Sequence, residues 1–298
     1  MRVYSIKELE NFSGTKAHTI RIWEQRYELL KPKRTETGIR IYNDDDLKKI
    51  LATAILIKSG FKISKVAKLS KEEMNFELSK VEDKNGIDEQ TKYETYINGL
   101  LSAGVRFEEK EFISIFNKSQ EKYDPYVIYI EIIYPLLVKI GTMWGRDDMN
   151  PLQEHFISNI LRQKILIDID LLPVNETSNN EIALFLPEKE THEIGLLLSN
   201  YLLKKAGFKT YYFGQQVPVI NLTSFIEEKN IKQAVGFIFH SQGSEKLNKM
   251  LNVLTKKCPN TTFYWGGSEG PLKALNITPN HKIINSIDDF KNQIIDNN

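Results

Sequence analysis

The sequence has one cysteine, Cys258, among 298 residues, so no disulfide can form within the chain. This excludes the disulfide framework on which small secreted proteins depend. Long apolar runs are also missing: the most apolar stretch, residues 127–140, contains Glu131, Pro135 and Lys139 and is too short to span a bilayer. The first residues lack the apolar segment of a signal peptide. We therefore expect a cytoplasmic protein without a membrane segment.

The net charge is only +1, but charge is distributed unevenly along the chain. Residues 1–80 hold 17 lysines and arginines against 11 aspartates and glutamates, whereas the remaining residues hold 23 against 28. A basic segment joined to an acidic remainder favours a polyanionic partner for the basic segment alone.

Two polar stretches divide the chain into three segments, which we predict to be domains at 1–80, 91–172 and 181–298. The first contains short helices and one hairpin. In the second, apolar residues recur at helical spacing, which indicates a bundle of about four helices. In the third, five short apolar runs alternate with helical stretches, as in a doubly wound parallel sheet. These runs are 182–186, 210–213, 235–239, 262–265 and 282–284. The predicted fold class is multidomain α and α/β.

The first segment has the pattern of a helix-turn-helix. Ser5 and Thr15 are the predicted N-caps of two short helices, which are joined by a turn at Ser13-Gly14. The second helix and the basic hairpin that follows it carry side chains suited to phosphates and base edges. The candidate DNA-binding residues are Lys16, His18, Thr19, Arg21, Arg34, Arg40 and Tyr42.

Residues 4–60 closely resemble the MerR family of winged-helix regulators. The similarity includes the string from Ile20 to Tyr27, then Pro32, Gly38 and the pair Asp46-Leu47. The resemblance implies a winged helix-turn-helix domain that binds a double-stranded DNA operator, with one helix in the major groove. Many members dimerise through a long helix after this domain, but only residues 71–84 are available here. We therefore expect a homo-oligomer, a dimer or tetramer, that assembles through the later domains.

A histidine follows the first predicted strand of the third segment, at the sheet edge where open α/β folds bind ligands. The carboxylate of Glu190 could orient the His192 imidazole, and Gly195 would let a ligand approach the next helix. Ser241 and the pair Gly266-Gly267 end later strands at the same edge. A hydroxyl and two positions without side chains suit a long ligand tail there.

These residues resemble the cobalamin-binding domain of methionine synthase and its relatives. In that family the histidine replaces the cofactor's own benzimidazole as the lower axial ligand of cobalt. The resemblance therefore implies that cobalamin binds here with His192 as the metal ligand. Gly243 stands where the family usually has leucine, which weakens the assignment of the tail pocket.

The bundle segment contains Trp144 followed ten residues later by Glu154-His155. This string resembles the helical cap of the CarH/LitR photoreceptors, which join a MerR-like domain to a cobalamin domain. In that group the Trp and Glu lie against the adenosyl group of adenosylcobalamin, which implies the same cofactor and the same contacts here. Gly145 is a departure, because the best-known members have a histidine there that binds cobalt after photolysis.

The sequence thus predicts a non-enzymatic transcriptional regulator, a repressor, that is controlled by cobalamin and responds to light. Two alternatives stay open. One is a cobalamin-dependent methyl-transferring protein, since a bundle joined to a cobalamin domain also occurs in methyltransferase modules. The other is a MerR-type regulator that senses another ligand or a protein.

Overall fold

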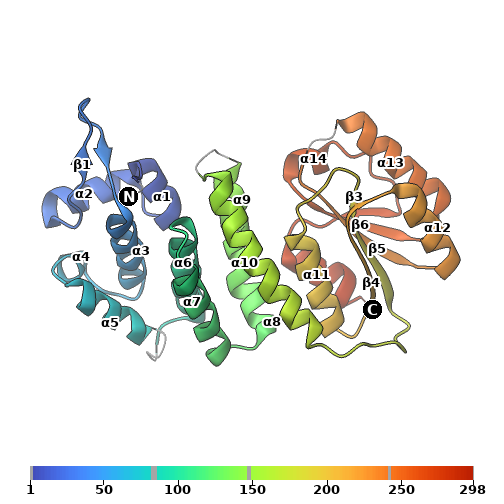
Figure 1. The fold of residues 1–298 in the computed structure, drawn as a ribbon, viewed down its shortest axis with the longest axis horizontal. Coiled ribbons are helices and arrows are strands. Elements are labelled where there is room, and N and C mark those ends of the chain that lie inside the picture. Colours follow the sequence, from blue (N-terminus) through green and yellow to red (C-terminus); the bar gives the residue numbers. More distant parts are fainter. Residues whose placement is uncertain (1–2, 82–85, 146–148, 241–242, 298) are drawn as a thin grey trace. The chain divides into compact units, whose positions relative to one another are not determined.

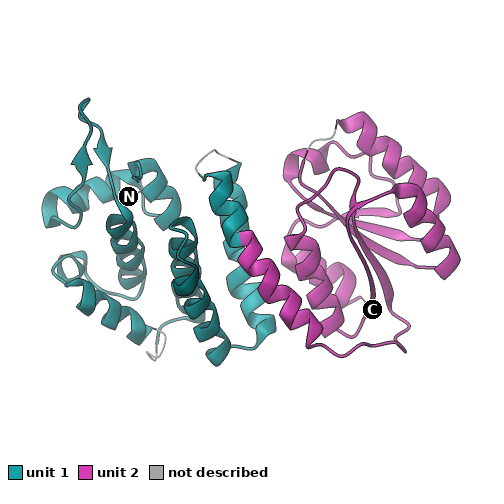
Figure 2. Ribbon diagram, viewed as in Figure 1, with its two compact units in different colours: residues 1–157 teal, residues 158–298 magenta. Residues whose placement is uncertain are grey.

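A computed structural model describes residues 3–81, 86–145, 149–240 and 243–297. The chain divides into two compact units, residues 1–157 and residues 158–298 (Figure 2). The division falls within one helix, α10 (Pro151–Asp170). Each unit is described by itself below.

The first part of unit 1 is a small helical domain with a two-stranded wing (Figure 1). We call it the head. Its elements are α1 (Ile6–Ser13), α2 (Ala17–Tyr27), β1 (Lys33–Arg34), β2 (Arg40–Ile41), α3 (Asp44–Lys58), α4 (Ile63–Val66) and α5 (Lys71–Val81). Strands β1 and β2 are antiparallel and form the wing between α2 and α3. The predicted winged helix-turn-helix is therefore present.

Local sequence signals set the ends of the first two helices. Ser5 Oγ accepts the backbone N–H of Glu8 while the Glu8 carboxylate accepts that of Ser5, so a capping box starts α1. Gly14 ends α1 with a φ of 69°, which costs glycine little. The prediction that Thr15 caps α2 is wrong, because Lys16 is the N-cap residue and no side chain accepts a bond there.

The second part of unit 1 is the predicted helical bundle. Its elements are α6 (Glu89–Val105), α7 (Glu109–Lys122), α8 (Pro125–Val127), η1 (Ile128–Ile133), α9 (Tyr134–Trp144) and the first part of α10. Elements α8, η1 and α9 form one continuous helix, in which the π-helical turn η1 directly precedes Pro135 in the first turn of α9.

This continuous helix corrects the prediction that the apolar stretch is too short for a bilayer. It has 20 residues, and by length and composition alone it could cross a membrane. A core helix of a bundle meets the same criteria, and Ile128, Ile132, Leu136 and Ile140 are buried among the other helices.

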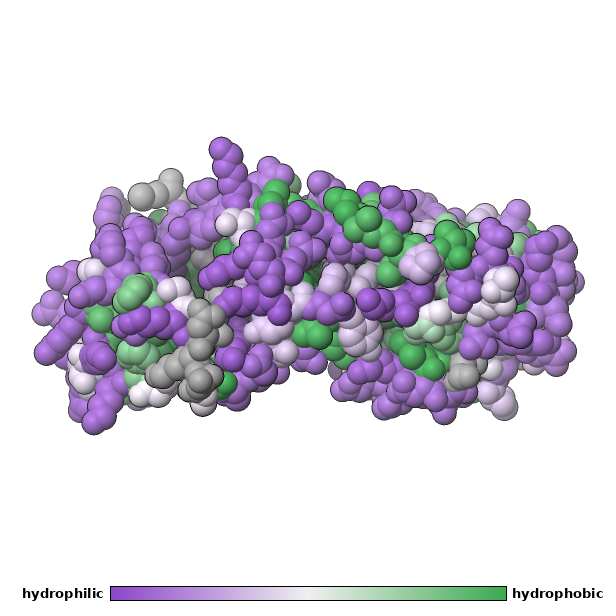
Figure 3. All heavy atoms as spheres, turned by 90° about the horizontal axis from the view of Figure 1, so that it is seen from below, coloured by the Kyte–Doolittle hydropathy of each residue, from purple (hydrophilic) through white to green (hydrophobic). Residues whose placement is uncertain are grey.

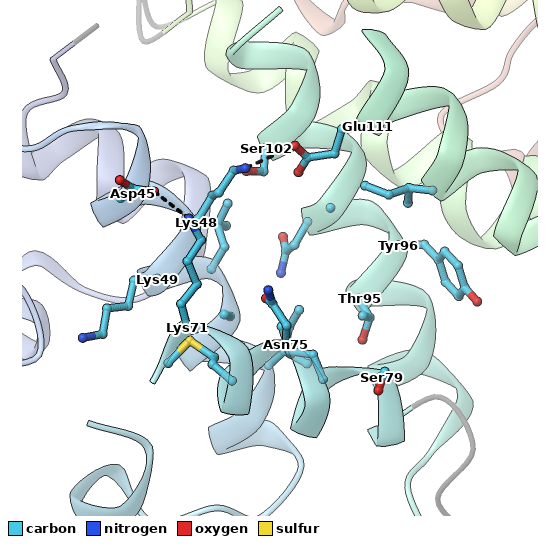
Figure 4. Close-up of a pocket in the computed structure, with 18 of the residues that line it drawn as sticks. Asp45, Lys48, Lys49, Lys71, Asn75, Ser79, Thr95, Tyr96, Ser102 and Glu111 are labelled. Atoms are coloured by element: carbon cyan, nitrogen blue, oxygen red, sulfur yellow. Dashed lines mark hydrogen bonds and ion pairs between the residues drawn. The ribbon is translucent and has the colours of Figure 1, made fainter. Parts of the chain in front are cut away.

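Two ion pairs join the head to the bundle within unit 1. Lys58 of α3 pairs with Glu94 of α6, and Lys48 of α3 pairs with Glu111 of α7. Beside the second pair lies a cavity of about 710 Å³, with α3 and α5 on one side and α6 and α7 on the other (Figure 4). The residues that line it include none of the predicted site residues.

A lysine from the bundle also contacts the helix-turn-helix. Lys139 of α9 donates to the carbonyl of Phe12 near the end of α1 and, over 3.1 Å, to the side chain of Asn98 in α6. Burial lowers the pKa of Lys139 to about 8. The middle helix of the bundle is thus bonded directly to the first helix of the head.

Several apolar side chains on α10 stay exposed to solvent. Leu152, Leu166 and Ile167 are 66%, 40% and 57% exposed, and Leu171, just after the helix, is 77% exposed. Figure 3 shows one face of the molecule, where apolar side chains form several separate areas among hydrophilic ones.

Unit 2 contains a five-stranded sheet in which every neighbouring pair is parallel. Its strands are β3 (Glu181–Pro187), β4 (Lys209–Val217), β5 (Gln233–Ile238), β6 (Thr262–Gly267) and β7 (His281–Ile283). The spatial order β4-β3-β5-β6-β7 is that of a doubly wound fold, so the predicted α/β class is confirmed. The direction of the connections reverses between β3 and β5, and ligands bind at this switch point.

Helices cover both faces of the sheet (Figure 1). Helix α11 (Ile194–Lys205) lies on one face, and α12 (Val219–Lys229) and α13 (Ser244–Lys257) pack together on the other. Shorter elements follow the last strands: α14 (Glu269–Lys273), α15 (Ile287–Phe290) and η2 (Lys291–Ile295). The core under α12 and α13 includes Phe185, Ala234 and Trp265, which point to the same face of the sheet.

The fold requires a residue without a side chain at position 267, which is Gly267. Its φ is 135°, and a Cβ there would overlap the carbonyl group of Ile238, so Gly267→Ala should lower the free energy of unfolding by at least about 2 kcal/mol. Gly270→Ala is the matched control, because Gly270 lies in α14 with open space beside its Cα, and alanine favours a helix. Urea denaturation of both variants measures the difference. Equal stability of the two variants would contradict this packing.

Candidate functional site

The carboxylate of Glu190 is the centre of the site at the switch point of unit 2. Glu190 lies in the loop after β3, and its side chain is fully buried. Its Oε1 atom accepts the backbone N–H groups of Thr191 and His192 and lies 2.7 Å from Nδ1 of the His192 ring. Its Oε2 atom accepts the N–H groups of Phe239 and His240 over 2.8 and 3.2 Å. One carboxylate thus joins the loops that follow β3 and β5.

These donors keep Glu190 ionised and set the orientation of His192. Burial alone would raise the pKa of the Glu190 carboxyl, but the hydrogen bonds from the His192 ring and from three backbone N–H groups together lower it to about 2. Since the carboxylate can only accept, Nδ1 of His192 carries the proton. Nε2 is then the nitrogen whose lone pair can bind a metal.

A second imidazole, that of His240, lies beside His192. The ring centroids are 4.5 Å apart, and Nδ1 of His240 is 3.7 Å from Oε1 of Glu190. The side chains of His192 and His240 are 32% and 47% exposed, so both can be reached from solvent. His240 is not among the residues predicted from the sequence. Its position directly after the apolar run 235–239 was the available signal.

The glycines of the predicted cradle lie against an aromatic ring. A Cβ at Gly266 would come 2.5 Å from the ring of Phe237, and one at Gly195 would come 3.4 Å from it. The sequence predicts that these glycines leave room for a ligand tail, but in the structure Phe237 fills the space beside both. A tail at this place therefore requires the ring to move. Ser241 lies outside the described residues.

Glu193, just before α11, is a second polar centre in unit 2 that was not predicted. Its carboxylate accepts the Tyr212 hydroxyl over 2.9 Å, Nε2 of Gln215 over 3.1 Å and Nε of Arg162 over 3.0 Å. Burial and the bond to Glu193 raise the pKa of Tyr212 far above its usual value. These bonds connect α10 and β4 to the loop that carries His192.

The candidate residues of the bundle lie in unit 1, at the end of α9 and the start of α10. Trp144 is 38% exposed. Nδ1 of His155 lies 2.7 Å from a carboxylate oxygen of Glu154, so the two predicted residues are paired with each other. Gly145 follows Trp144 as the C-cap residue of α9.

The candidate DNA-binding residues of α2 and the wing form an exposed basic face of the head. Lys16, His18 and Arg21 are exposed along α2, and Thr19 is half-buried between them. Arg34 is exposed on the wing, where its guanidinium donates to the carbonyl of Gly38 over 3.0 Å. Exposed side chains of these kinds are the ones that contact phosphates and base edges in DNA-binding domains.

Tyr42 and Arg40 were predicted to contact DNA, but in the structure both side chains are bonded to Glu24 of α2. Tyr42 is fully buried, and its hydroxyl donates to Glu24 of α2 over 2.5 Å. Arg40 donates to the other oxygen of Glu24 over 3.1 Å and is 27% exposed. Both residues therefore hold the wing against α2, and the buried Tyr42 ring is not available for a direct contact with DNA.

Two family models match the chain. The model of the MerR HTH family regulatory protein matches residues 4–73, which are the head. The model of a B12 binding domain matches residues 96–167, which are helices of the bundle and α10. The chain has a MerR-type helix-turn-helix domain and a B12-binding domain.

Two repressors from Myxococcus xanthus are similar to this chain over most of their length. The HTH-type transcriptional repressor CarH is 28% identical over 222 residues, which are 74% of this chain and 74% of CarH. The HTH-type transcriptional repressor CarA is 24% identical over 276 residues, which are 91% of this chain and 89% of CarA. The chain is thus a transcriptional regulator that is similar to these two repressors and has a MerR-type helix-turn-helix domain and a B12-binding domain.

A solved structure shares the fold. The monomethylamine corrinoid protein of Methanosarcina barkeri matches 65% of this chain and 95% of its own, with a TM-score of 0.51 and 15% sequence identity. This likeness shows that the chain shares the fold of the corrinoid protein over more residues than the B12 binding model matches.

Replacing Glu190 should change how stability depends on pH in the cobalamin-free protein. The pKa of Glu190 falls from 4.5 to about 2 on folding, so its stabilising contribution is complete above about pH 4.5 and is lost as the pH falls through 2. Glu190→Gln should therefore be less stable than wild type at pH 7, and the difference should shrink as the pH falls from 4.5 to 2. Glu188→Gln, on the exposed part of the same loop, is the control. A difference that is the same at pH 7 and pH 2 would contradict this role.

Proposed function

We propose that this regulator is a repressor whose DNA binding is controlled by cobalamin. The observation that carries the proposal is the His192 imidazole, held by the buried carboxylate of Glu190 at the switch point of the sheet. Histidines that bind metals through Nε2 commonly donate Nδ1–H to a carboxylate, so His192 would hold the cobalt of the cofactor through Nε2. The further cofactor contacts that we propose are Gly195, Ser241, Gly266 and Gly267.

The cofactor that we propose is adenosylcobalamin, which supplies a light-sensitive cobalt–carbon bond when bound. Trp144 offers an aromatic face and Glu154 a carboxylate for the adenosyl group, and Glu154 holds His155 beside it. Gly145 has no side chain that could bind cobalt, so His155 would be the imidazole that the bundle offers to the cofactor.

The basic face of the head would bind operator DNA in the cytoplasm, and several heads would act together in a homo-oligomer. The exposed apolar residues of α10 support a contact between chains, since such side chains often mark interaction surfaces. A dimer or tetramer that forms only with the adenosyl group in place would raise the apparent affinity for DNA through multivalency. Both Myxococcus relatives are named repressors, which supports repression as the outcome.

A methyl-transferring corrinoid protein is the second candidate, because the Methanosarcina protein shares the fold of much of the chain. The MerR-type head favours the regulator, since a carrier of methyl groups has no use for an exposed basic helix and wing. Specific binding of operator DNA by the full chain separates the two functions.

His192→Ala should weaken cobalamin binding by at least about tenfold, or return the visible spectrum of the cofactor to that of its free form. The fold should be unaffected, because the imidazole is partly exposed in a loop. Absorbance after incubation with adenosylcobalamin in the dark, followed by dialysis, measures both quantities. Glu188→Gln serves as the control from the same loop. A variant with unchanged affinity and spectrum would rule out His192 as the axial ligand.

Arg21→Ala should weaken operator binding by about 1–3 kcal/mol, because it removes a cation from the exposed face of α2. Affinity should also fall steeply with salt, since phosphate contacts release counterions. Lys246→Ala removes the same charge from an exposed site on α13 of unit 2 and should leave binding unchanged. Electrophoretic mobility shifts of the full chain provide the measurement. Equal losses in the two variants would show that only net charge matters.

Light should change both the oligomer and its affinity for DNA. Size-exclusion chromatography of the adenosylcobalamin complex is expected to show a larger species in the dark than after green light, with tighter operator binding by the larger species. The physical reason is that removal of the adenosyl group takes away the contacts that favour the assembled state. Identical size and affinity in both states would exclude the light switch and leave cobalamin binding intact.

A further inference from the structure

Three side chains with metal-binding atoms meet at the switch point. Glu190, His192 and His240 each bring one such atom within 4.8 Å of the other two, and the described part of the chain contains no other cluster of this kind. The family resemblance accounts for the first two residues but gives no role to His240. We propose that His192 and His240 bind a divalent transition-metal ion in the cobalamin-free protein, at a site that cobalamin displaces.

The positions of the ring nitrogens determine which atoms would bind the ion. Nδ1 of His192 and Nδ1 of His240 lie 2.7 and 3.7 Å from the same oxygen of Glu190. The His192 ring donates Nδ1–H to this oxygen, so Nε2 is the atom of that ring that would bind the ion. Nδ1 of His240 lies beyond hydrogen-bond distance, so Glu190 does not fix which nitrogen of that ring would bind. Glu190 accepts backbone N–H groups from both loops, which holds the two histidines close together, and its charge balances that of the ion.

The two imidazole ligands determine which class of metal ion the site would favour. Zn²⁺, Ni²⁺ and Cu²⁺ bind imidazole nitrogen well, whereas Mg²⁺ and Ca²⁺ prefer oxygen ligands. Both rings are partly exposed, so water can complete the coordination of the ion.

His281, which lies in the core of unit 2, differs from His192 and His240 in its surroundings. Nδ1 of His281 accepts from Trp265 over 2.9 Å, and Nε2 lies 3.0 Å from the hydroxyl of Thr255. Burial lowers the pKa of His281 to about 4, so it is a neutral part of the core. Both nitrogens of His281 are bonded within the core, whereas His192 and His240 lie at the sheet edge where open α/β folds bind ligands.

The two ligands would compete because they share His192. An ion bound to Nε2 of His192 keeps that nitrogen from cobalt, so cobalamin can bind only after the ion leaves. Metal availability would then set the cobalamin concentration at which the regulator becomes loaded. This competition is the one part of the inference that rests on the proposed function.

Titration of the full, tag-free chain with Zn²⁺ in a calorimeter tests the site. We expect one ion per chain for wild type, and at least about tenfold weaker binding for His240→Ala and for His192→Ala. Glu188→Gln removes an exposed carboxylate from the same loop and should keep the wild-type affinity, which controls for attraction by charge alone. Circular dichroism of each variant confirms that the fold is kept.

Cobalamin binding, measured with and without Zn²⁺, separates this inference from the proposed function. His240→Ala should bind cobalamin as tightly as wild type does, whereas Zn²⁺ should weaken cobalamin binding to wild type and not to His240→Ala. No Zn²⁺ binding by wild type, or equal binding by His240→Ala, would overturn the metal site. Zn²⁺ binding by a chain that takes up no cobalamin would keep the metal site and reject the proposed cofactor.

Discussion

A carboxylate that is buried must be compensated by donors, and five N–H groups from two loops compensate Glu190. The loops lie 49 residues apart in the sequence and follow the two strands that flank the switch point. Their joint hold on one carboxylate places His192 and His240 side by side. Removal of the carboxylate would leave both loops with unsatisfied donors, so the arrangement of the two imidazoles depends on this one group.

The helix that links the proposed cofactor contact to the DNA-binding domain lies entirely within unit 1. It ends at Trp144, and five residues earlier Lys139 donates to the carbonyl of Phe12 in the head. The ion pairs from α3 to α6 and α7 add further bonds between the head and the bundle. These bonds are the contacts through which a movement of α9 at its Trp144 end would act on the head.

Most elements could be predicted from the sequence, because hydrophobic periodicity and capping residues are local signals. The five strands, the wing and the capping box at Ser5 belong to this group. What could not be predicted depends on partners distant in sequence. The buried Tyr42 hydroxyl is bonded to Glu24, and Phe237 fills the space beside Gly195 and Gly266. The helix that starts at α8 continues past Pro135 through a π-helical turn. His240 was missed although it directly follows the predicted strand 235–239, because the family motif that points to Ser241 gives His240 no role.

The most direct test of the central claim is electron paramagnetic resonance of the bound cobalt(II) cofactor in protein grown with ¹⁵N-labelled histidine. The axial nitrogen splits the cobalt lines according to its nuclear spin. If Nε2 of His192 binds cobalt, each line should change from the triplet of ¹⁴N to the doublet of ¹⁵N when the labelled protein replaces the unlabelled one. A triplet that persists in the labelled protein would mean that the cofactor keeps its own base, and would contradict the role of His192.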